Sequence, residues 1–146
     1  MVFFPRKFLK KQEGDMILKC IKEAESKTSG EIRVHFQKKI KDDVLTEAAK
    51  KFYDLKMDKT KDKNGVLIFI VPRKKQFAII GDEGINKVVP DDFWNEIKDV
   101  LEKYFKNSNW AEGICKAIKL SGEKLKKYFP VQDDDINELP DEISYS

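Results

Sequence analysis

The most constraining feature of the sequence is an uninterrupted apolar run at residues 66–71, bounded by Gly65 and Pro72. The run is short and rich in β-branched residues, so it predicts a strand that is buried on both faces. A second apolar segment follows at residues 77–80 after a short turn. A connection this short joins antiparallel strands. The chain is therefore expected to fold around a buried β-hairpin that needs helices on both sides to exclude water.

The segments around this hairpin supply one more strand and the covering helices. Alternation of apolar and polar residues over 31–36 predicts a strand with one drier face. Apolar residues recur at helical spacing in four segments, namely residues 15–26, 42–55, 90–105 and 109–129. Because a helix connects the strand at 31–36 to the strand at 66–71, we expect that pair to be parallel. The predicted fold class is α/β: a three-layer α/β/α sandwich with a small mixed β-sheet, flanked by about four helices.

The length of 146 residues suits one domain. We expect a flexible basic lead at residues 1–11, an α/β domain at residues 12–130 and an acidic tail at residues 131–146. The tail holds six acidic residues and no Lys or Arg. One interpretation of it is a solvated, flexible end. The other is that Leu139, Pro140 and Ile143 dock on the domain, or on a partner, as a short linear motif.

The composition excludes several classes of protein. No apolar run approaches the roughly 18 residues that a membrane span needs. The N-terminus lacks the apolar core of a secretory signal, so we expect a cytoplasmic protein without a membrane span. The net charge is +3, but lysines are scattered over the predicted helices, so we expect no nucleic-acid partner. We expect a monomer and leave an unknown protein partner open. Cys20 and Cys115 fall on apolar helix faces, which indicates buried, reduced thiols.

Carboxylates and loop oxygens are expected to gather at one end of the sheet. Given the predicted strand directions, this end collects the starts of the strands at 31–36 and 66–71 and the end of the strand at 77–80. The candidate metal ligands there are Asp82, Glu83, Asp91 and Asp92. Ca²⁺ prefers oxygens of this kind, and Mg²⁺ is the alternative ion. A second interpretation of Asp91 and Asp92 is an N-cap and a first-turn acid of the helix that follows.

Four stretches of the chain together resemble one known family. They are residues 28–34 (TSGEIRV), 64–69 (NGVLIF), 77–85 (FAIIGDEGI) and 110–114 (WAEGI). In this order they resemble the TPM domain family, which is named for a thylakoid lumen protein, a photosystem II repair factor and a worm receptor modulator. The resemblance covers roughly residues 12–130. It is strongest to soluble, single-domain bacterial members that end in an Asn-Glu-Leu-Pro-Asp-Glu-Ile tail, here residues 137–143.

The resemblance implies both a fold and a function. It implies an α/β/α sandwich with a mixed sheet, as the residues themselves predict. It also implies divalent-cation binding, mainly of Ca²⁺, at the Gly-x-Glu-Gly loop and the Asp that follows. Here these are Glu83, with Asp82 beside it, and Asp91 or Asp92. The longer spacing after Glu83 leaves open which Asp binds. We expect a binding or accessory module, with a metal-dependent, acid phosphatase-like phosphomonoester hydrolase as the alternative because a plant member is described as an acid phosphatase.

The sequence does not assign catalytic residues. His35 is the one histidine, and a lone strand histidine is more typical of a surface or hydrogen-bonded group than of a catalytic base. Cys20 has no nearby glycine loop or arginine that could hold a phosphate. Metal-assisted hydrolysis at the acidic residues is thus the route that a phosphatase would use.

Overall fold

The computed structural model describes residues 8–131 and 143–146. Its helices are α1 (Lys11–Glu25), α2 (Val44–Asp54), α3 (Glu83–Asn86), α4 (Asn95–Lys106) and α5 (Trp110–Lys126), with 3-10 turns η1 (Met57–Lys59) and η2 (Pro72–Lys74). Its strands are β1 (Glu31–Phe36), β2 (Gly65–Val71), β3 (Gln76–Gly81) and β4 (Ile143–Tyr145). The strands form a mixed sheet in the order β3-β2-β1-β4.

The pairing of the first three strands confirms the predicted directions. β1 and β2 are parallel, with Glu31 opposite Gly65. β2 and β3 are antiparallel, with Val66 opposite Gly81. The turn between them is the 3-10 turn η2, followed by Lys75 in the left-handed region at φ 53°. The hairpin inferred from two apolar runs is therefore the centre and one edge of the sheet.

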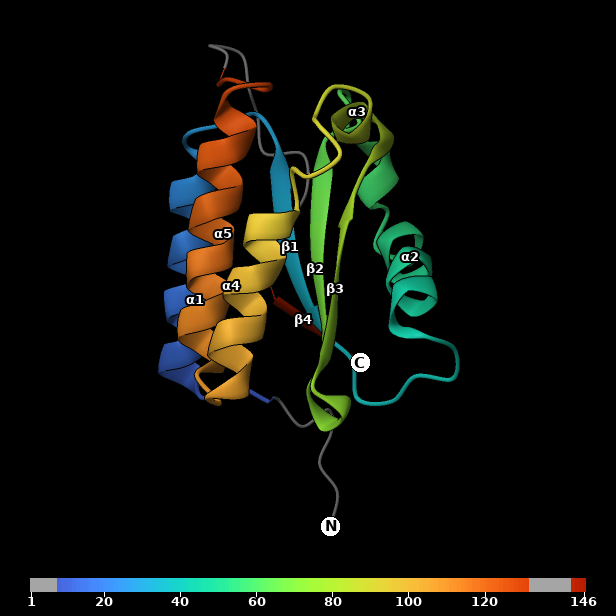
Figure 1. Ribbon diagram of the computed structural model, residues 1–146, viewed down its shortest axis with the longest axis vertical. Helices are drawn as coiled ribbons and strands as arrows, with labels where there is room; N and C mark the ends of the chain where they lie inside the picture. The colour runs from blue at the N-terminus through green and yellow to red at the C-terminus, as the bar shows by residue number, and fades with distance from the viewer. Residues whose placement is uncertain (1–7, 132–142) are drawn as a thin grey trace.

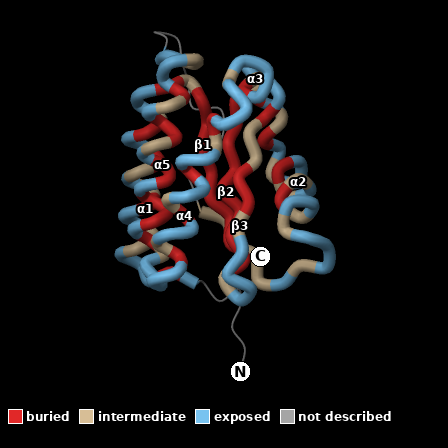
Figure 2. Tube along the Cα trace, in the orientation of Figure 1, coloured by how far each residue is buried: buried red, intermediate tan, exposed pale blue. Residues whose placement is uncertain are grey.

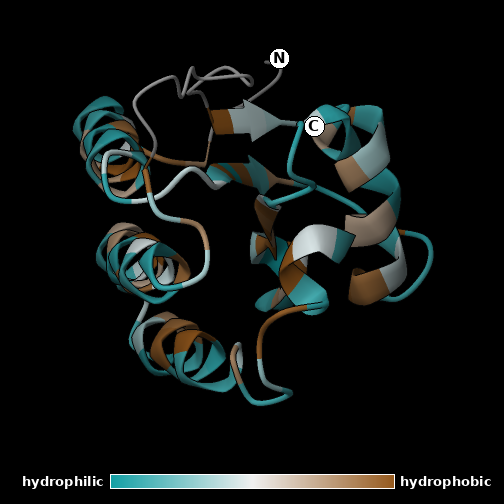
Figure 3. Cartoon of the chain, turned by 90° about the horizontal axis from the view of Figure 1, so that it is seen from above, coloured by the Kyte–Doolittle hydropathy of each residue, from teal (hydrophilic) through white to brown (hydrophobic). Residues whose placement is uncertain are grey.

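Helices cover both faces of the sheet, which confirms the three-layer α/β/α sandwich (Figures 1 and 3). α1, α4 and α5 form one layer, in which α5 packs against both α1 and α4. α2 forms the opposite layer and packs against β2 and β3. Every residue of β2 is buried, because this strand has helices over both of its faces (Figure 2).

The alternating side chains of the strands divide the core in two. Ile32, Val34 and Phe36 of β1 join the larger core under α1, α4 and α5. Leu67 and Phe69 of β2 join the smaller core under α2. The polar residues of β1 lie on the α2 side, where the sequence pattern predicted a wetter face, yet the whole strand is buried.

The fold begins earlier in the chain than predicted. α1 begins at Lys11 rather than near residue 15. Leu9 is buried, and the ring of Phe8 lies 5.6 Å from that of Phe36 and 5.3 Å from that of Trp110. Residues 8–11 of the expected flexible lead therefore belong to the packed domain, because their aromatic and apolar side chains find a place at its edge. Residues 1–7 lie outside the described part.

The last residues of the expected acidic tail form a strand. β4 pairs parallel with β1, with Val34 opposite Ile143 and Phe36 opposite Tyr145. The N–H of Ser146 donates to the Phe36 carbonyl at 2.9 Å, and the Tyr145 ring stacks on Phe36 at 5.5 Å. A flexible end at residues 143–146 was thus the wrong interpretation, because β1 offers an unpaired edge and an apolar neighbour. Ile143 packs on the core as the docking interpretation expected, while Leu139 and Pro140 lie outside the described residues.

Candidate functional site

The strand ends meet at one end of the sheet, as the predicted directions required. The N–H of Asp82 donates to the Gly65 carbonyl at 3.0 Å, which ties the end of β3 to the start of β2. The N–H of Glu31 donates to the Asn64 carbonyl at 3.3 Å, which ties in the start of β1. The short helix α3 sits directly on this end of the sheet, at the top of Figure 1. These backbone bonds position the first candidate ligand.

Asp82 is the buried member of the predicted ligand set. It is the N-cap of α3, and its Oδ1 accepts a hydrogen bond from the Glu83 N–H at 2.8 Å. The residue is only 8 % exposed. Its Oδ2 is buried and has no hydrogen-bond partner among the described residues. A buried carboxylate oxygen without a donor is costly, so the position favours a bound cation or water.

A loop of backbone carbonyls packs against the first turn of α3. A Cβ added to Gly84 would collide with the carbonyl oxygen of Asp62 and would lie 2.5 Å from that of Lys63. Lys63 has a φ of 52°, in the left-handed region. Its Nζ donates to the Asp58 carbonyl at 2.7 Å, which closes the loop on itself. Gly84, the second glycine of the Gly-x-Glu-Gly motif, is therefore needed so that α3 can lie directly on the loop that carries Asp62 and Lys63.

A second contact brings the segment after α3 back to the end of β3. A Cβ on Gly81 would run into the indole ring of Trp94. Trp94 Nε1 donates to Asn86 Oδ1 at 3.3 Å, and Asn86 Nδ2 donates to the Gly81 carbonyl at 2.8 Å. The turn that carries Asp91 and Asp92 directly precedes Trp94, so it is held beside α3.

Asp91 and Asp92 are not helix caps, contrary to one prediction. α4 begins at Asn95. Trp94 occupies the N-cap position, and its side chain makes no capping hydrogen bond. The predicted start near residue 90 is therefore wrong by several residues. The intervening residues form turns instead, with the Phe93 N–H donating to the Pro90 carbonyl at 3.0 Å. The physical reason is packing: the turn buries Phe93 and lays Trp94 over Gly81 before the helix can start.

The other three candidate ligands are exposed. Glu83, Asp91 and Asp92 are exposed to solvent, whereas Asp82 is buried. Over residues 8–131 and 143–146, no three or more His, Cys, Asp and Glu side chains form a group that could hold a metal ion. The structure thus places the predicted residues on neighbouring segments at one end of the sheet, but among the described residues their side chains do not form a metal-binding cluster.

Comparison with known proteins identifies the family. The TPM domain family matches the chain over residues 2–124. The chain belongs to the TPM domain family. The match covers most of the chain and includes the Gly-x-Glu-Gly loop and the segment with Asp91 and Asp92. Among curated proteins, none matches this TPM domain.

Two solved structures are similar to this TPM domain. The BA42 protein from the psychrophilic bacterium Bizionia argentinensis, solved by NMR, is 45% identical in sequence. It superposes with a TM-score of 0.92, covering 97% of this chain and 98% of that one. The N-terminal domain of the cg2496 protein from Corynebacterium glutamicum is 11% identical and has a TM-score of 0.65, covering 98% of this chain and 88% of that one. The similarity to the cg2496 domain, at this low identity, is a similarity of fold alone.

Across the described residues of the TPM domain, no helix is long and apolar enough to cross a membrane.

The sequence did not predict a buried polar cluster that this TPM domain builds on β1. His35 is 1% exposed, and its ring stacks on Phe69 with centroids 5.6 Å apart. Its Nδ1 lies 2.6 Å from Ser144 Oγ, and its Nε2 lies 2.9 Å from Gln37 Oε1 and 2.8 Å from Ser146 Oγ. Alternation along β1 showed which face His35 occupies, but Ser144 lies in β4 and Ser146 directly follows it. Sequence spacing could not reveal that pairing.

Burial and nearby positive charges keep the His35 side chain neutral. Burial lowers the pKa of His35 to about 4, and this effect exceeds the opposing one of the hydrogen bond that Gln37 Oε1 accepts, which raises the pKa. The positive charges of Lys51 and Arg33 lower the pKa further. A neutral, buried imidazole with both ring nitrogens at hydrogen-bond distance from partners serves to hold the strands together. It has no open side for a substrate.

The two cysteines are free thiols in the helical layer. Cys115 is buried on α5 and its Sγ lies 3.6 Å from the Met16 carbonyl, to which it donates. Burial raises the pKa of the Cys115 thiol, with a contribution from the neighbouring Cys20. Cys20 is half-buried. A thiol with a raised pKa is a poor nucleophile, so Cys115 fits the predicted buried, reduced thiol. Cys20 is a free thiol but is less buried than predicted.

Proposed function

We propose that this TPM domain binds a divalent cation, Ca²⁺ or Mg²⁺, where β3 passes into α3, and acts as a binding or accessory module. The observation that carries the proposal is the buried Oδ2 of Asp82, which has no hydrogen-bond partner among the described residues. A cation would satisfy that oxygen, and a carboxylate is the ligand that hard cations prefer. Glu83 and the turn with Asp91 and Asp92 would supply further oxygens.

The distribution of burial indicates what kind of site this would be. One carboxylate is buried and fixed by its hydrogen bond to the Glu83 N–H, whereas the acidic residues around it are exposed. Exposed carboxylates and water can adapt to the long and variable bonds of Ca²⁺. Mg²⁺ demands a stricter octahedral shell and gives up its water reluctantly. We therefore expect both ions to bind, with Ca²⁺ drawing in more protein ligands than Mg²⁺.

The structure lends no separate support to the phosphatase alternative. Hydrolysis of a phosphomonoester would use a water activated by the same cation. His35, the one histidine of the chain, is buried beneath α2 and held by Ser144 and Gln37, so it could not serve as a base for that water. Cation binding is the part that both alternatives share, and it is the part that we propose.

An NMR titration of the full-length protein with CaCl₂ tests the proposal. We expect saturable amide shifts centred on Asp82, Glu83 and Gly84, and an increase in Tm as the ion binds the folded state. Asp82→Asn should abolish both effects while keeping the fold, because Asn is as good an N-cap as Asp. Asp99→Asn, an exposed carboxylate of α4, is the matched control and should titrate as the wild type does. Equal titration of the two variants would contradict the proposal.

The same protein preparation tests the phosphatase alternative. If a generic phosphomonoester is hydrolysed, the double variant Glu83→Gln with Asp91→Asn should lose that activity. Equal rates in wild type and double variant would show that the activity does not come from this site. Loss of activity in the double variant, together with Ca²⁺ dependence, would instead establish the metal-dependent hydrolase.

A further inference from the structure

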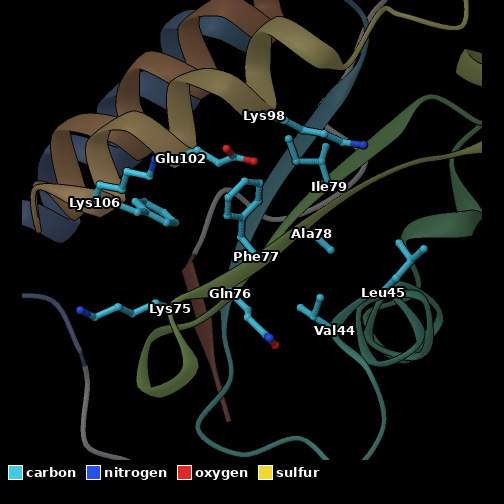
Figure 4. Close-up of a pocket in the computed structure, with 11 residues that line it drawn as sticks. Val44, Leu45, Lys75, Gln76, Phe77, Ala78, Ile79, Lys98, Glu102 and Lys106 are labelled. Atoms are coloured by element: carbon cyan, nitrogen blue, oxygen red, sulfur yellow. The ribbon is translucent and has the colours of Figure 1, made fainter.

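A groove runs along the outer edge of the sheet, away from the acidic end. It lies between α2 and α4, and β3 forms its floor (Figure 4). Val44 and Leu45 line it from α2, and Lys98 and Lys106 line it from α4. Its volume is about 550 Å³, which suits a few residues of an extended chain.

The backbone of β3 is open toward this groove. β3 is the edge strand of the sheet, and β2 is its partner on one side. Hydrogen bonding in an antiparallel pair alternates from residue to residue. Since the Asp82 N–H bonds to β2, every second residue before it, including Ile80 and Ala78, also faces β2. The N–H and C=O groups of Phe77 and Ile79 therefore point away from β2, where an added strand could bond to them.

The rim of the groove is basic. Lys75, Lys98 and Lys106 line it together with a single carboxylate, Glu102. In the described part of the chain, none of these three lysines belongs to an ion pair within 4.0 Å. Unpaired cations around a concave surface attract acidic groups and raise the rate at which they associate.

The walls of the groove are apolar and continue onto α2. Phe77 and Ile79 face the α4 side, and Phe77 packs edge-on against Phe105 with centroids 5.6 Å apart. Leu45 is 58% exposed and also lines a second, shallow hollow on α2 with Tyr53, which is 62% exposed. Exposed apolar groups of this size, next to an open strand edge, are typical of an interaction surface.

We propose that this groove binds an extended acidic segment of a partner protein, which pairs with β3 as a fifth strand of the sheet. Its backbone would bond to Phe77 and Ile79, alternate apolar side chains would enter the groove, and acidic side chains would meet Lys98 and Lys106. A second copy of this chain fits less well. A symmetric dimer through β3 would bring the lysines of each copy against those of the other.

The test uses the full-length protein and a synthetic peptide of about eight residues with alternating Val and Glu, labelled for fluorescence anisotropy. We expect saturable binding that weakens with added salt, and no binding of the matched peptide with Lys in place of Glu. Amide shifts on binding should map to residues 76–79. Failure of the acidic peptide to bind, or equal binding of the two peptides, would overturn the proposal.

Variants locate the site on the protein. The double substitution Lys98→Glu with Lys106→Glu should weaken binding by about tenfold or more, equivalent to about 1.4 kcal/mol. The matched control is Lys116→Glu with Lys119→Glu on the exposed face of α5, which should bind like the wild type. Equal weakening by both pairs would show that general charge, rather than the groove, attracts the peptide, and the proposal would fail.

Backbone methylation tests the added strand itself. N-methylation of the peptide at alternate residues removes the N–H groups on one edge of its strand. One of the two alternating sets should abolish binding and the other should leave it intact, because only one edge of the added strand faces β3. Equal binding of both methylated peptides would overturn strand addition. A dimer of the free protein that the peptide does not dissociate would assign the edge to a second copy instead.

Discussion

The two edges of the sheet are finished in opposite ways. At the β1 edge, the chain returns its own C-terminal strand, β4, and fastens it with hydrogen bonds and stacked rings. At the β3 edge, the described residues place no strand, and three lysines surround the groove that remains. Unpaired edges invite association with other chains, and proteins commonly cover them or place charges around them. This domain covers one side of the sheet with β4 and surrounds the open β3 edge with lysines, which would favour an acidic strand over others.

The difference lies in what each edge buries. The buried ring of His35 stabilises β4, because its two nitrogens lie at hydrogen-bond distance from Ser144, Ser146 and Gln37. Its Tyr145 ring covers Phe36. The β3 edge instead exposes Leu45 and keeps its lysines without ion pairs among the described residues. The comparison predicts that changes at the β1 edge cost folding stability, whereas changes at the β3 edge alter binding.

The largest effect should follow from removing β4. A variant that ends at residue 142 loses the side chains of Ile143 and Tyr145 and the backbone bonds of Ser146 with Phe36 and Lys38. It also leaves His35 without its serine partners. We expect the free energy of unfolding, measured in urea, to fall by roughly 3–5 kcal/mol. A loss below about 1 kcal/mol would show that β4 rests on the domain without stabilising it.

The pH dependence of stability should report the same histidine. The pKa of His35 falls from 6.5 to about 4 on folding, so between these values the unfolded state binds the extra proton. Stability is therefore fully present above pH 6.5 and is lost as the pH falls toward 4, by about 3 kcal/mol. Urea unfolding of wild type and His35→Gln at a series of pH values measures this. The variant should lose less stability over that interval, and parallel curves for the two proteins would contradict a buried neutral imidazole.

A smaller effect should come from a single hydroxyl. Ser144→Ala removes the group 2.6 Å from His35 Nδ1 and leaves that buried nitrogen without the serine. We expect a loss of roughly 1–2 kcal/mol, typical of a buried polar group deprived of its partner. Ser146→Ala is the matched comparison, because Ser146 is exposed and Gln37 also lies at hydrogen-bond distance from His35 Nε2. The two variants should differ, with Ser144→Ala the less stable in urea.

Sequence patterns predicted the strands at one edge, but at the other edge they suggested only that Ile143 docks and not that it begins a strand. The β3 edge comes from two apolar runs joined by a short turn, and such a hairpin is a local feature. The β1 edge depends on β4, which is only three residues long and follows β1 by more than a hundred residues. A segment so short carries no periodicity, so only the folded structure reveals its partner.

The candidate site was predictable to a similar extent. Strand directions placed Asp82 at the right end of the sheet, because topology alone decides where β3 ends. The start of α4 was misplaced, since Pro90 and Asp91 resemble a helix start while Phe93 and Trp94 must pack first. Among the described residues, Asp82 Oδ2 has no hydrogen-bond partner because of how several segments pack around it, and no pattern in the sequence encodes that packing.

The smallest effect on stability should come from the open edge, and it sharpens the comparison most. Leu45→Lys replaces a side chain on α2 that is 58% exposed, so folding removes little of its apolar area from water and the substitution forfeits little burial. We expect the free energy of unfolding to change by less than about 0.5 kcal/mol. Ala48→Lys is the contrasting variant, because Ala48 is fully buried one helical turn away and a charged side chain there should destabilise the domain severely. A large loss from Leu45→Lys would mean that the groove is part of the core, and the two edges would then serve the same purpose.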